Sequence, residues 1–270
     1  MAFTSLVTAV FAKKGFNVMI QHHRYEAILE MINEKSFVSI EKLAKHFNVT
    51  HQTIRRDLNE LSEQRKIVRH HGGAGTVSST TNTAYQARKI MDLPAKQKIA
   101  ERLVKDIPNG ASLFINIGTT TETIAQALLS HSDLQIVTNN LHVAAILGSK
   151  KDFSVIIAGG EVRHRDGGVI GEATESFIRN FRMDYGIIGI SGIDTDGSLL
   201  DFDYREVRVA QAIIENSREV LLAADGTKFG RRAMVSLANI SQANRFYTDL
   251  EPPETIKKIL KDNKVALHLV

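Results

Sequence analysis

The sequence contains no cysteine among its 270 residues. Disulfide bonds, thiolate metal sites and a cysteine nucleophile are therefore excluded, and a reducing cytoplasm is compatible with the composition. Long apolar runs are also missing, and a run such as Glu219 to Asp225 is far too short to cross a bilayer. The net charge of +4 is a mild bias that does not by itself indicate a partner.

Histidine is concentrated near the N-terminus, since six of the ten histidines lie between Ile20 and Gly75. Their spacing does not fit a metal site, so we expect neither a metal nor a cofactor. The apolar stretch of residues 1–19 ends in Lys13 and Lys14 without a preceding basic region, which argues against a secretory signal. We interpret residues 1–19 as a disordered or loosely docked extension, or as the result of a start codon assigned too early.

The stretch from Ser39 to Glu63 predicts two short helices joined by a tight turn. The first helix has the i, i+3, i+4, i+7 spacing that buries one face, with Ile40, Leu43, Ala44 and Phe47. Thr50 is a good N-cap for the second helix because its hydroxyl can accept a bond from a free backbone N–H. The inner stripe of the second helix consists of Ile54, Leu58 and Leu61.

Long polar side chains cover the other face of the second predicted helix. They belong to His51, Gln52, Thr53, Arg55, Arg56 and Asn59. In a helix-turn-helix the second helix enters the DNA major groove, where Gln, Arg and Asn match the base edges. We therefore expect these residues to bind DNA. An ordinary helical hairpin with a solvated polar face is the alternative.

A basic segment directly after this helix weakens that alternative. Ile67 and Val68 suit a short strand, and the glycine pair at 72–73 suits a tight return. The pattern predicts a β-hairpin wing that can lie along the phosphate backbone. Its candidate DNA contacts are Arg69, His70 and His71.

Two motifs in this region resemble the signature of DeoR-type bacterial transcriptional repressors. They are Val49-Thr50-x-x-Thr53-Ile54-Arg55-Arg56-Asp57-Leu58-Asn59-x-Leu61 and Arg69-His70-His71-Gly72-Gly73-Ala74. The resemblance extends from about Gln21 to the C-terminus. It implies a cytoplasmic repressor rather than an enzyme, with a winged helix-turn-helix, double-stranded operator DNA as partner and assembly as a homo-oligomer.

Further stretches carry the resemblance into the second half of the chain. They are Phe114-Ile115-Asn116-Ile117-Gly118-Thr119-Thr120, Val137-Thr138-Asn139-Asn140-Leu141, Arg165-Asp166-Gly167-Gly168 and Gly189-Ile190-Ser191-Gly192-Ile193-Asp194. These stretches are similar to family members that respond to sn-glycerol 3-phosphate. The resemblance therefore implies this ester as the inducer, and another sugar phosphate is the alternative.

Composition predicts a boundary between two domains at residues 76–95. The winged helix-turn-helix should occupy residues 20–75. Gly, Ser and Thr dominate from Ala74 to Thr83, which is typical of a linker. Tyr85 to Met91 resembles the family's connector, although an exposed amphipathic helix explains it equally well. A ligand-sensing domain should then occupy residues 96–270.

Strand-like and helical segments alternate from Lys96 onward. The expected strands are Ser112–Ile117, Leu134–Val137, Ser154–Ala158, Tyr185–Ile190, Glu219–Ala224, Arg245–Tyr247 and Val265–Leu269. The expected helices include Lys98–Ile107, Thr121–Ser130, Leu141–Ser149, Thr174–Phe181 and Val207–Ser217. Apolar strands between helices indicate an α/β domain whose mostly parallel sheet is covered on both faces. The family resemblance implies a fold similar to ribose-5-phosphate isomerase, and a two-domain α+β chain as a whole.

Polar and glycine-rich segments follow four of the predicted strands. Ligands of parallel sheets bind outside the carboxyl ends of the strands, so we expect a phosphate ester there. Gly118 allows close backbone approach where a helix begins, and Thr119, Thr120 and Thr121 add hydroxyl groups. The other candidates are Thr138, Asn139, Asn140, Gly160 and, as a point charge, Lys228. Capping and turn formation explain the same glycine and threonine pattern.

Acidic residues needed for isomerase chemistry are largely missing. The isomerases carry an Asp-Gly-Ala-Asp-Glu run for proton transfer. This sequence has Ile188, Ser191 and Gly192 at the matching positions, and only Glu206 corresponds to a retained glutamate. The pattern predicts a phosphate site without catalysis, and an isomerase that also binds DNA is the alternative. Candidates for contact with the other end of the ligand are Asp203, Tyr204 and Arg205, together with Asp201, which are otherwise surface charges.

Overall fold

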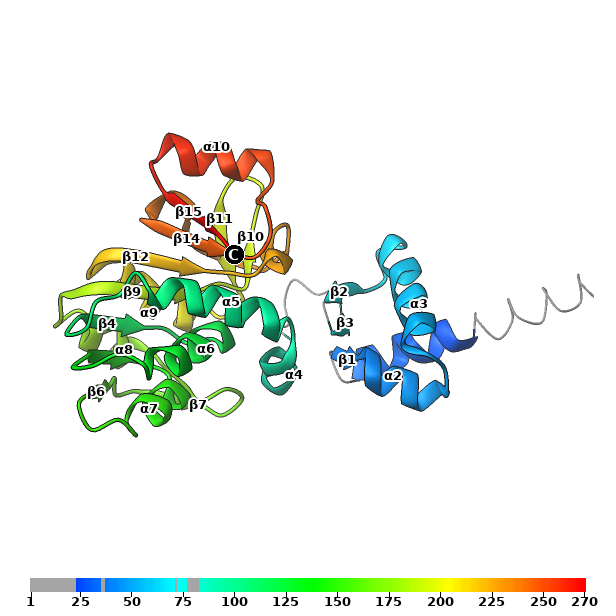
Figure 1. Cartoon of the computed structure of the whole chain (residues 1–270), viewed down its shortest axis with the longest axis horizontal. Coiled ribbons are helices and arrows are strands. Elements are labelled where there is room, and N and C mark those ends of the chain that lie inside the picture. The colour runs from blue at the N-terminus through cyan, green and yellow to red at the C-terminus, as the bar shows by residue number, and fades with distance from the viewer. Residues whose placement is uncertain (1–22, 35–36, 71, 77–82) are drawn as a thin grey trace, which may run out of the picture. The chain divides into compact units, whose positions relative to one another are not determined.

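The structure is a computed structural model that describes residues 23–34, 37–70, 72–76 and 83–270 (Figure 1). The predicted extension at residues 1–19 lies outside this described part. The described residues form two compact units. The N-terminal unit ends at residue 76 and also takes in Gln86–Met91, and the C-terminal unit comprises residues 83–85 and Asp92–Val270.

Up to residue 76, the described part of the N-terminal unit consists of three helices and a small sheet. Residues 23–34 are helical, and the other elements are β1 (Phe37–Ser39), α2 (Ile40–Phe47), α3 (His51–Glu63), β2 (Val68–His70) and β3 (Gly73–Gly75). Ser39 caps α2 by accepting a hydrogen bond from the backbone N of Lys42, and Asn48 ends the helix in the left-handed conformation. The predicted helix pair and wing are confirmed.

The sheet of this unit requires glycine at position 73, and it includes Ala74 and Gly75, where the linker-like composition begins. Its antiparallel order is β1-β3-β2. A Cβ atom on Gly73 would lie 2.2 Å from the backbone oxygen of Val38, so only glycine allows β1 and β3 to approach this closely. Ala74 and Gly75 pair with β1 and β2 instead of starting the linker, because the chain needs them to close the sheet.

A parallel sheet of seven strands forms the centre of the C-terminal unit. Its order is β15-β14-β12-β9-β4-β5-β6. The strands are β4 (Ser112–Ile115), β5 (Gln135–Thr138), β6 (Ser154–Ile157), β9 (Met183–Gly189), β12 (Ser217–Ala223), β14 (Arg245–Thr248) and β15 (Ala266–Leu269). All six pairings between neighbours are parallel. Each of the seven predicted strands is confirmed, with ends that differ by a few residues.

Alternate residues of the strands pack into two separate cores, one on each face of the sheet. Leu113 and Ile115 pack with α5 (Leu93–Val104), α6 (Thr119–Leu128) and α7 (Leu141–Leu147). Phe114, which lies between them, packs in a second core that contains α8 (Glu172–Ile178), α9 (Tyr204–Glu215) and α10 (Glu254–Asp262). Both faces of the sheet are therefore buried, as the apolar runs predicted.

Several short elements were not predicted, and four of the predicted helices, α5, α6, α8 and α9, begin earlier than expected. The additional elements are α10, β7 (Glu161–Arg163), β8 (Gly168–Ile170), β10 (Gly192–Ile193), β11 (Ser198–Asp201), β13 (Val235–Asn239), η1 (Gly226–Lys228) and η2 (Ile240–Gln242). The helix that was one of two interpretations of Tyr85–Met91 is present as α4 (Tyr85–Ile90). Pro94 lies in the first turn of α5, a position where its missing N–H costs nothing, so this helix starts before Lys98. Asp203 caps α9, which therefore starts before Val207.

Candidate functional site

The packing of α3 leaves its polar face open. Ile54, Leu58 and Leu61 are fully buried, and Thr50 accepts a hydrogen bond from the backbone N of Thr53 at 3.2 Å, as predicted. Five of the six residues of this helix that were predicted to contact DNA are exposed: His51, Gln52, Arg55, Arg56 and Asn59. Thr53 is half-buried, and its hydroxyl lies 2.9 Å from that of Thr50.

An ion pair between two helices holds α3 in place. Asp57 is buried, and both of its carboxylate oxygens accept from the guanidinium of Arg24, at 2.6 and 3.1 Å. Tyr25 adds a second link, since its hydroxyl donates to Glu60 at 2.7 Å. One side of α3 thus binds the helix of residues 23–34, and another side faces solvent. The helix is a rigid support for its exposed side chains.

The wing adds positive charge next to α3. Arg69 on β2 is half-buried, and its pKa is lowered by burial and then by the nearby charge of Arg55. Two guanidinium groups held close together favour an anion beside them, and a DNA phosphate is such an anion. His70 lies in β2, and His71 lies outside the described residues.

Strand order in the seven-stranded sheet reverses between β4 and β9. The chain proceeds from β4 outward through β5 to β6, and then returns to β9 on the other side of β4. In parallel sheets, ligands bind outside the carboxyl ends at the point where the order reverses. The segment after β4 contains Gly118 and the start of α6, and the segment after β9 contains Ser191.

Backbone groups dominate at the start of α6. Gly118 precedes the helix with φ of +154°, and no side chain caps the first turn. Thr119 and Thr120 are buried at this helix start, while the Thr121 hydroxyl donates to the backbone oxygens of Asn116 and Gly118, both at 2.7 Å. Thr121 therefore holds the loop in shape. The backbone N–H groups of the first turn can donate hydrogen bonds to a bound anion.

The polar residues after β5 mainly position neighbouring segments. Thr138 donates to the backbone oxygen of Ile115 at 2.6 Å, and the side chain of Asn139 donates to the backbone oxygen of Val169 in β8 at 3.0 Å. Asn140 caps α7. The Oδ1 atoms of Asn116 and Asn139 are buried and accept no hydrogen bond from the described residues. Such an atom is satisfied only by water or a ligand donor.

Two lysines and an aspartate lie together at the carboxyl end of β12. Lys228 lies 3.2 Å from Asp225, which is 1% exposed, and the positive charge of Lys96 also acts on this carboxylate. Burial raises the pKa of Asp225, but Lys228, Thr227 and Lys96 outweigh burial and hold it at about 2. Lys96 is itself buried, on the first turns of α5. Two ammonium groups and the Asp225 carboxylate thus interact at this strand end, and the Asp249 carboxylate accepts from the backbone N of Gly226 in the same loop at 2.8 Å.

A buried arginine organises the loops on the other side of β9. Arg163 in β7 contacts three carboxylates, at 2.8 Å from Asp166, 2.9 Å from Asp203 and 2.6 Å from Glu206. Burial, followed by the charge of Asp201, raises the pKa of Glu206 to about 7. The network fastens the β7–β8 hairpin to the start of α9. Because carboxylates surround it, Arg163 does not act as an isolated cation for an anionic ligand.

The remaining predicted contacts have different surroundings. Asp203 caps α9 and pairs with Arg163, and Arg205 lies 3.1 Å from Glu161. Tyr204 is 64% exposed. Gly160 follows β6 with φ of +154°, and a Cβ atom there would lie 2.1 Å from the Thr174 hydroxyl. The close packing of α8 thus explains this glycine without a ligand.

Comparison with known proteins bears on both units. Residues 24–80 match the DeoR-like helix-turn-helix domain, and residues 92–250 match the DeoR C terminal sensor domain. The chain belongs to the DeoR family. It is 55% identical to the glycerol-3-phosphate regulon repressor of Escherichia coli strain K12 over 93% of this chain and 100% of that protein. The repressor of the same name from Haemophilus influenzae is 50% identical over 93% of this chain and 98% of that protein.

Solved structures similar to this DeoR protein include ribose 5-phosphate isomerases. The enzyme from Plasmodium falciparum is 13% identical, with a TM-score of 0.36 over 50% of this chain and 52% of the other. This likeness is too low to support a conclusion about activity. No group of three or more His, Asp or Glu side chains in the described residues could hold a metal ion, and no helix among them is long and apolar enough to span a membrane.

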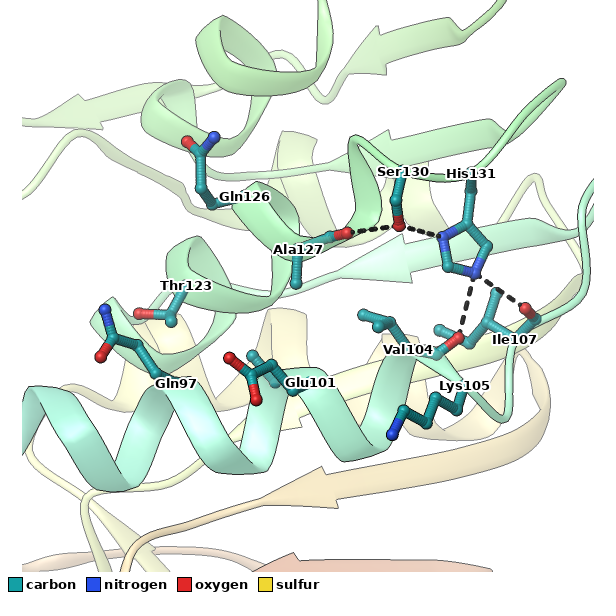
Figure 2. A pocket seen from close by; sticks show the side chains of 11 residues that line it. Gln97, Glu101, Val104, Lys105, Ile107, Thr123, Gln126, Ala127, Ser130 and His131 are labelled. Atoms are coloured by element: carbon teal, nitrogen blue, oxygen red, sulfur yellow. Dashed lines mark hydrogen bonds between the residues drawn. The ribbon is translucent and has the colours of Figure 1, made fainter.

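A separate groove of this DeoR protein lies between α5 and α6 (Figure 2). It has a volume of about 700 Å³ and a floor that includes Ala100, Val104 and Ala127. His131 closes one end, with its Nε2 atom 3.0 Å from the backbone oxygens of both Val104 and Ile107. Lys105 is the only lysine or arginine that lines it, and Glu101 offsets that charge. The groove therefore suits an anionic ligand less well than the edge of the sheet.

Two residues of the sheet edge of this DeoR protein were not found by sequence reasoning. Lys96 falls at the predicted domain boundary, and Arg163 precedes the motif at 165–168. The sequence does contain a signal for Lys96. Its i, i+3, i+4 spacing with Ile99 and Ala100 places it on the buried face of α5. No comparable signal marks Arg163, because a three-residue strand has no clear periodicity.

Proposed function

We propose that this DeoR protein is a transcriptional repressor that holds operator DNA through α3 and the wing, and releases it when the C-terminal unit binds sn-glycerol 3-phosphate. The regulated genes are those of glycerol and glycerophosphodiester use. The printed names of the two relatives support the choice of ligand. Their high identity over nearly the whole chain supports the choice of role.

The observation that carries the ligand proposal is the pair of lysines at the carboxyl end of β12. The charges of Lys96 and Lys228 both act on the buried carboxylate of Asp225. A phosphate ester would place its anion at the N–H groups of α6 and near these ammonium groups. The unpaired Oδ1 atoms of Asn116 and Asn139 can accept hydrogen bonds from hydroxyl groups. A small polyol phosphate offers both kinds of group.

The DNA proposal rests on the exposed polar face of α3. Gln52, Arg56 and Asn59 would contact base edges, and Arg55 and Arg69 together with His70 and His71 would contact phosphates. We propose further that the protein acts in the cytoplasm as a homo-oligomer, in line with the family resemblance. Two copies of α3 could then bind repeated or palindromic half-sites.

A thermal-shift screen tests the ligand proposal. A ligand that binds only the folded state raises the melting temperature, and stabilisation reaches about 2.7 kcal/mol at 100 times the Kd. The screen compares sn-glycerol 3-phosphate with glycerol, inorganic phosphate and other sugar phosphates. We expect the largest shift with glycerol 3-phosphate and operator release at the same concentrations. A larger shift with another sugar phosphate would identify that ester as the inducer instead.

An activity assay addresses the remaining alternative. Ile188 has an aliphatic side chain that cannot transfer a proton and is fully buried in the core, and Glu206 is bound to Arg163. We therefore expect no turnover of ribose 5-phosphate. Conversion to the ketose by purified protein would support an isomerase instead of a pure sensor.

A further inference from the structure

Tyr85 attaches the connector between the two units to the C-terminal unit. Tyr85 is the first residue of α4 and is 8% exposed. Its hydroxyl donates a hydrogen bond of 2.9 Å to Oε2 of Glu122. A hydrogen bond from a neutral donor to a carboxylate is among the stronger side-chain bonds. Tyr85 is therefore held firmly in the C-terminal unit.

Glu122 belongs to the same helix start as the candidate phosphate loop. It follows Thr121 directly, and its backbone N donates to the oxygen of Gly118 at 3.0 Å. Its second carboxylate oxygen accepts from the side chain of Asn140 at 3.3 Å. Asn140 in turn caps α7 after β5. One carboxylate thus joins the connector to two of the strand ends that surround the proposed site.

The ring of Tyr85 makes a second contact with the rim of the site. It stacks on His142, with 5.1 Å between centroids and 10° between planes. His142 lies against the turn of the β7–β8 hairpin, since a Cβ atom on Gly167 would be 3.1 Å from its Nε2 atom. Tyr85 therefore contacts α6 through its hydroxyl and α7 through its ring.

The chain passes from one unit to the other immediately after this residue. Tyr85 belongs to the C-terminal unit, whereas Gln86–Met91 group with the N-terminal unit. Any change at Glu122 that alters the position of Tyr85 is passed by covalent bonds to the remainder of α4.

We propose that Tyr85 couples ligand binding to operator release by reporting the position of the first turn of α6 to the connector. This inference rests on the proposed function. A ligand shifts an equilibrium only by its differential affinity for two states. An anion bound at the N–H groups of Gly118–Thr121 would change the geometry of Glu122 in the same turn. The Tyr85–Glu122 bond then has a different strength in the two states, and this difference is the coupling.

Tyr85→Phe tests the proposal because it removes the hydroxyl and keeps the ring on His142. The measured quantity is the coupling factor, which is the operator Kd with saturating glycerol 3-phosphate divided by the operator Kd without it. We expect this factor to fall about tenfold, while the Kd for the ester, measured by calorimetry, stays within about twofold of the parental value. A tyrosine with a purely structural role would not change the factor at matched ligand occupancy.

Tyr185→Phe is the matched control, because Tyr185 lies near the amino end of β9, whereas the proposed site lies at the carboxyl ends of the strands. It also loses one hydroxyl, and its coupling factor should be parental. Glu122→Gln is the second variant and replaces the charge-assisted bond with a neutral one of about half the strength. Its factor should lie between those of the parent and Tyr85→Phe. Parental factors in both Tyr85→Phe and Glu122→Gln would overturn the proposal.

Hydrogen exchange separates failure of the coupling from failure of the proposed function. In the parent, glycerol 3-phosphate should change the exchange of the amides of Gln86–Met91, and in Tyr85→Phe it should not. An equal change in both proteins would refute the role of Tyr85 while leaving the ligand proposal intact. A parent that is neither stabilised nor released from its operator by any phosphate ester would refute both.

Discussion

The ammonium nitrogen of Lys228 lies 3.2 Å from Oδ2 of Asp225, at the carboxyl end of β12. Burial raises the pKa of Asp225, but Lys228, Thr227 and Lys96 outweigh burial and hold it at about 2, below its ordinary 3.8. A depressed pKa means that the ionised carboxylate stabilises the fold above the ordinary pKa. This stabilisation, about 2 kcal/mol, is lost as the pH falls towards the pKa of the folded state.

Lys228→Ala should therefore affect both stability and ligand binding. Loss of the ammonium raises the pKa of Asp225, so acid unfolding should begin at a higher pH than in the parent. If Lys228 contacts the phosphate, the ester should bind roughly 10- to 150-fold more weakly. The variant would then hold its operator at inducer concentrations that free the parent. An acid titration of the melting temperature and an electrophoretic shift with glycerol 3-phosphate measure the two effects.

Operator affinity without ligand is the control for this variant, and it should remain parental because α3 lies in the other unit. Release at the parental inducer concentration would remove Lys228 from the site. The acid shift would still be expected in that case, because it depends only on the pair with Asp225.

The two adjacent arginines on α3 should have different roles in DNA binding. Arg55 lies close enough to Arg69 to lower its pKa, so we assign Arg55 to the phosphates and Arg56 to the bases. Arg55→Ala should weaken all sequences similarly and reduce the salt slope by about one unit. Arg56→Ala should cost roughly 1–3 kcal/mol at the operator and relax specificity. Fluorescence anisotropy over a range of salt concentrations measures both.

Lys258→Ala, an exposed cation in the C-terminal unit, controls for the change in net charge. A double Arg55→Ala and Arg56→Ala variant that bound the operator like this control would mean that α3 is not the recognition helix.

Arg24→Ala should destabilise the N-terminal unit strongly. It leaves Asp57, which is 1% exposed, without its ion-pair partner, and breaking such a buried pair costs about 3–5 kcal/mol. Arg24→Lys should recover only part of this loss because lysine cannot supply the two parallel bonds. Urea unfolding followed by circular dichroism measures the change. Lys45→Ala, at an exposed site of α2, should stay within about 0.5 kcal/mol of the parent.

Glu206 should make stability depend on pH near neutrality. Its pKa is raised from 4.5 to about 7 by burial and the charge of Asp201, so the folded state favours the neutral acid. Stability from this group is therefore present below the ordinary pKa and is lost as the pH rises towards about 7. Glu206→Gln should flatten the melting-temperature profile between about pH 4.5 and pH 7. A profile parallel to that of the parent would mean that Glu206 is ionised throughout this range.

Much of the fold follows from local patterns in the sequence. The seven parallel strands are apolar runs because both faces of the sheet are covered, and the helix pair follows from the spacing of residues such as Ile54 and Leu58. The elements that were missed, such as β7 and β8, are too short to show a period. Their positions depend on contacts with distant segments, including the bond from Asn139 to Val169.

The candidate site could be predicted only in part for a related reason. Strand ends marked by Gly118 and Lys228 are visible in the sequence because glycine and charge interrupt apolar runs. The pairing of Lys228 with Asp225 and the burial of Lys96 depend on how separate segments meet. Arg163, which is 40 residues from Asp203, could not be placed from spacing at all.

The reversal of strand order at β4 divides the rim of the sheet into an early and a late contribution. Gly118 to Glu122 and Asn140 come from the first part of the C-terminal unit, and these also anchor Tyr85. The segments at 201–206 and 225–228 come from the later part. Arg163 ties the segment at 201–206 to the early part of the unit, whereas no hydrogen bond or ion pair within the described residues joins the segment at 225–228 to Gly118–Glu122 or Asn140. In the proposed sensor, substitutions at 225–228 should therefore change the preferred phosphate ester and leave the link through Tyr85 in place.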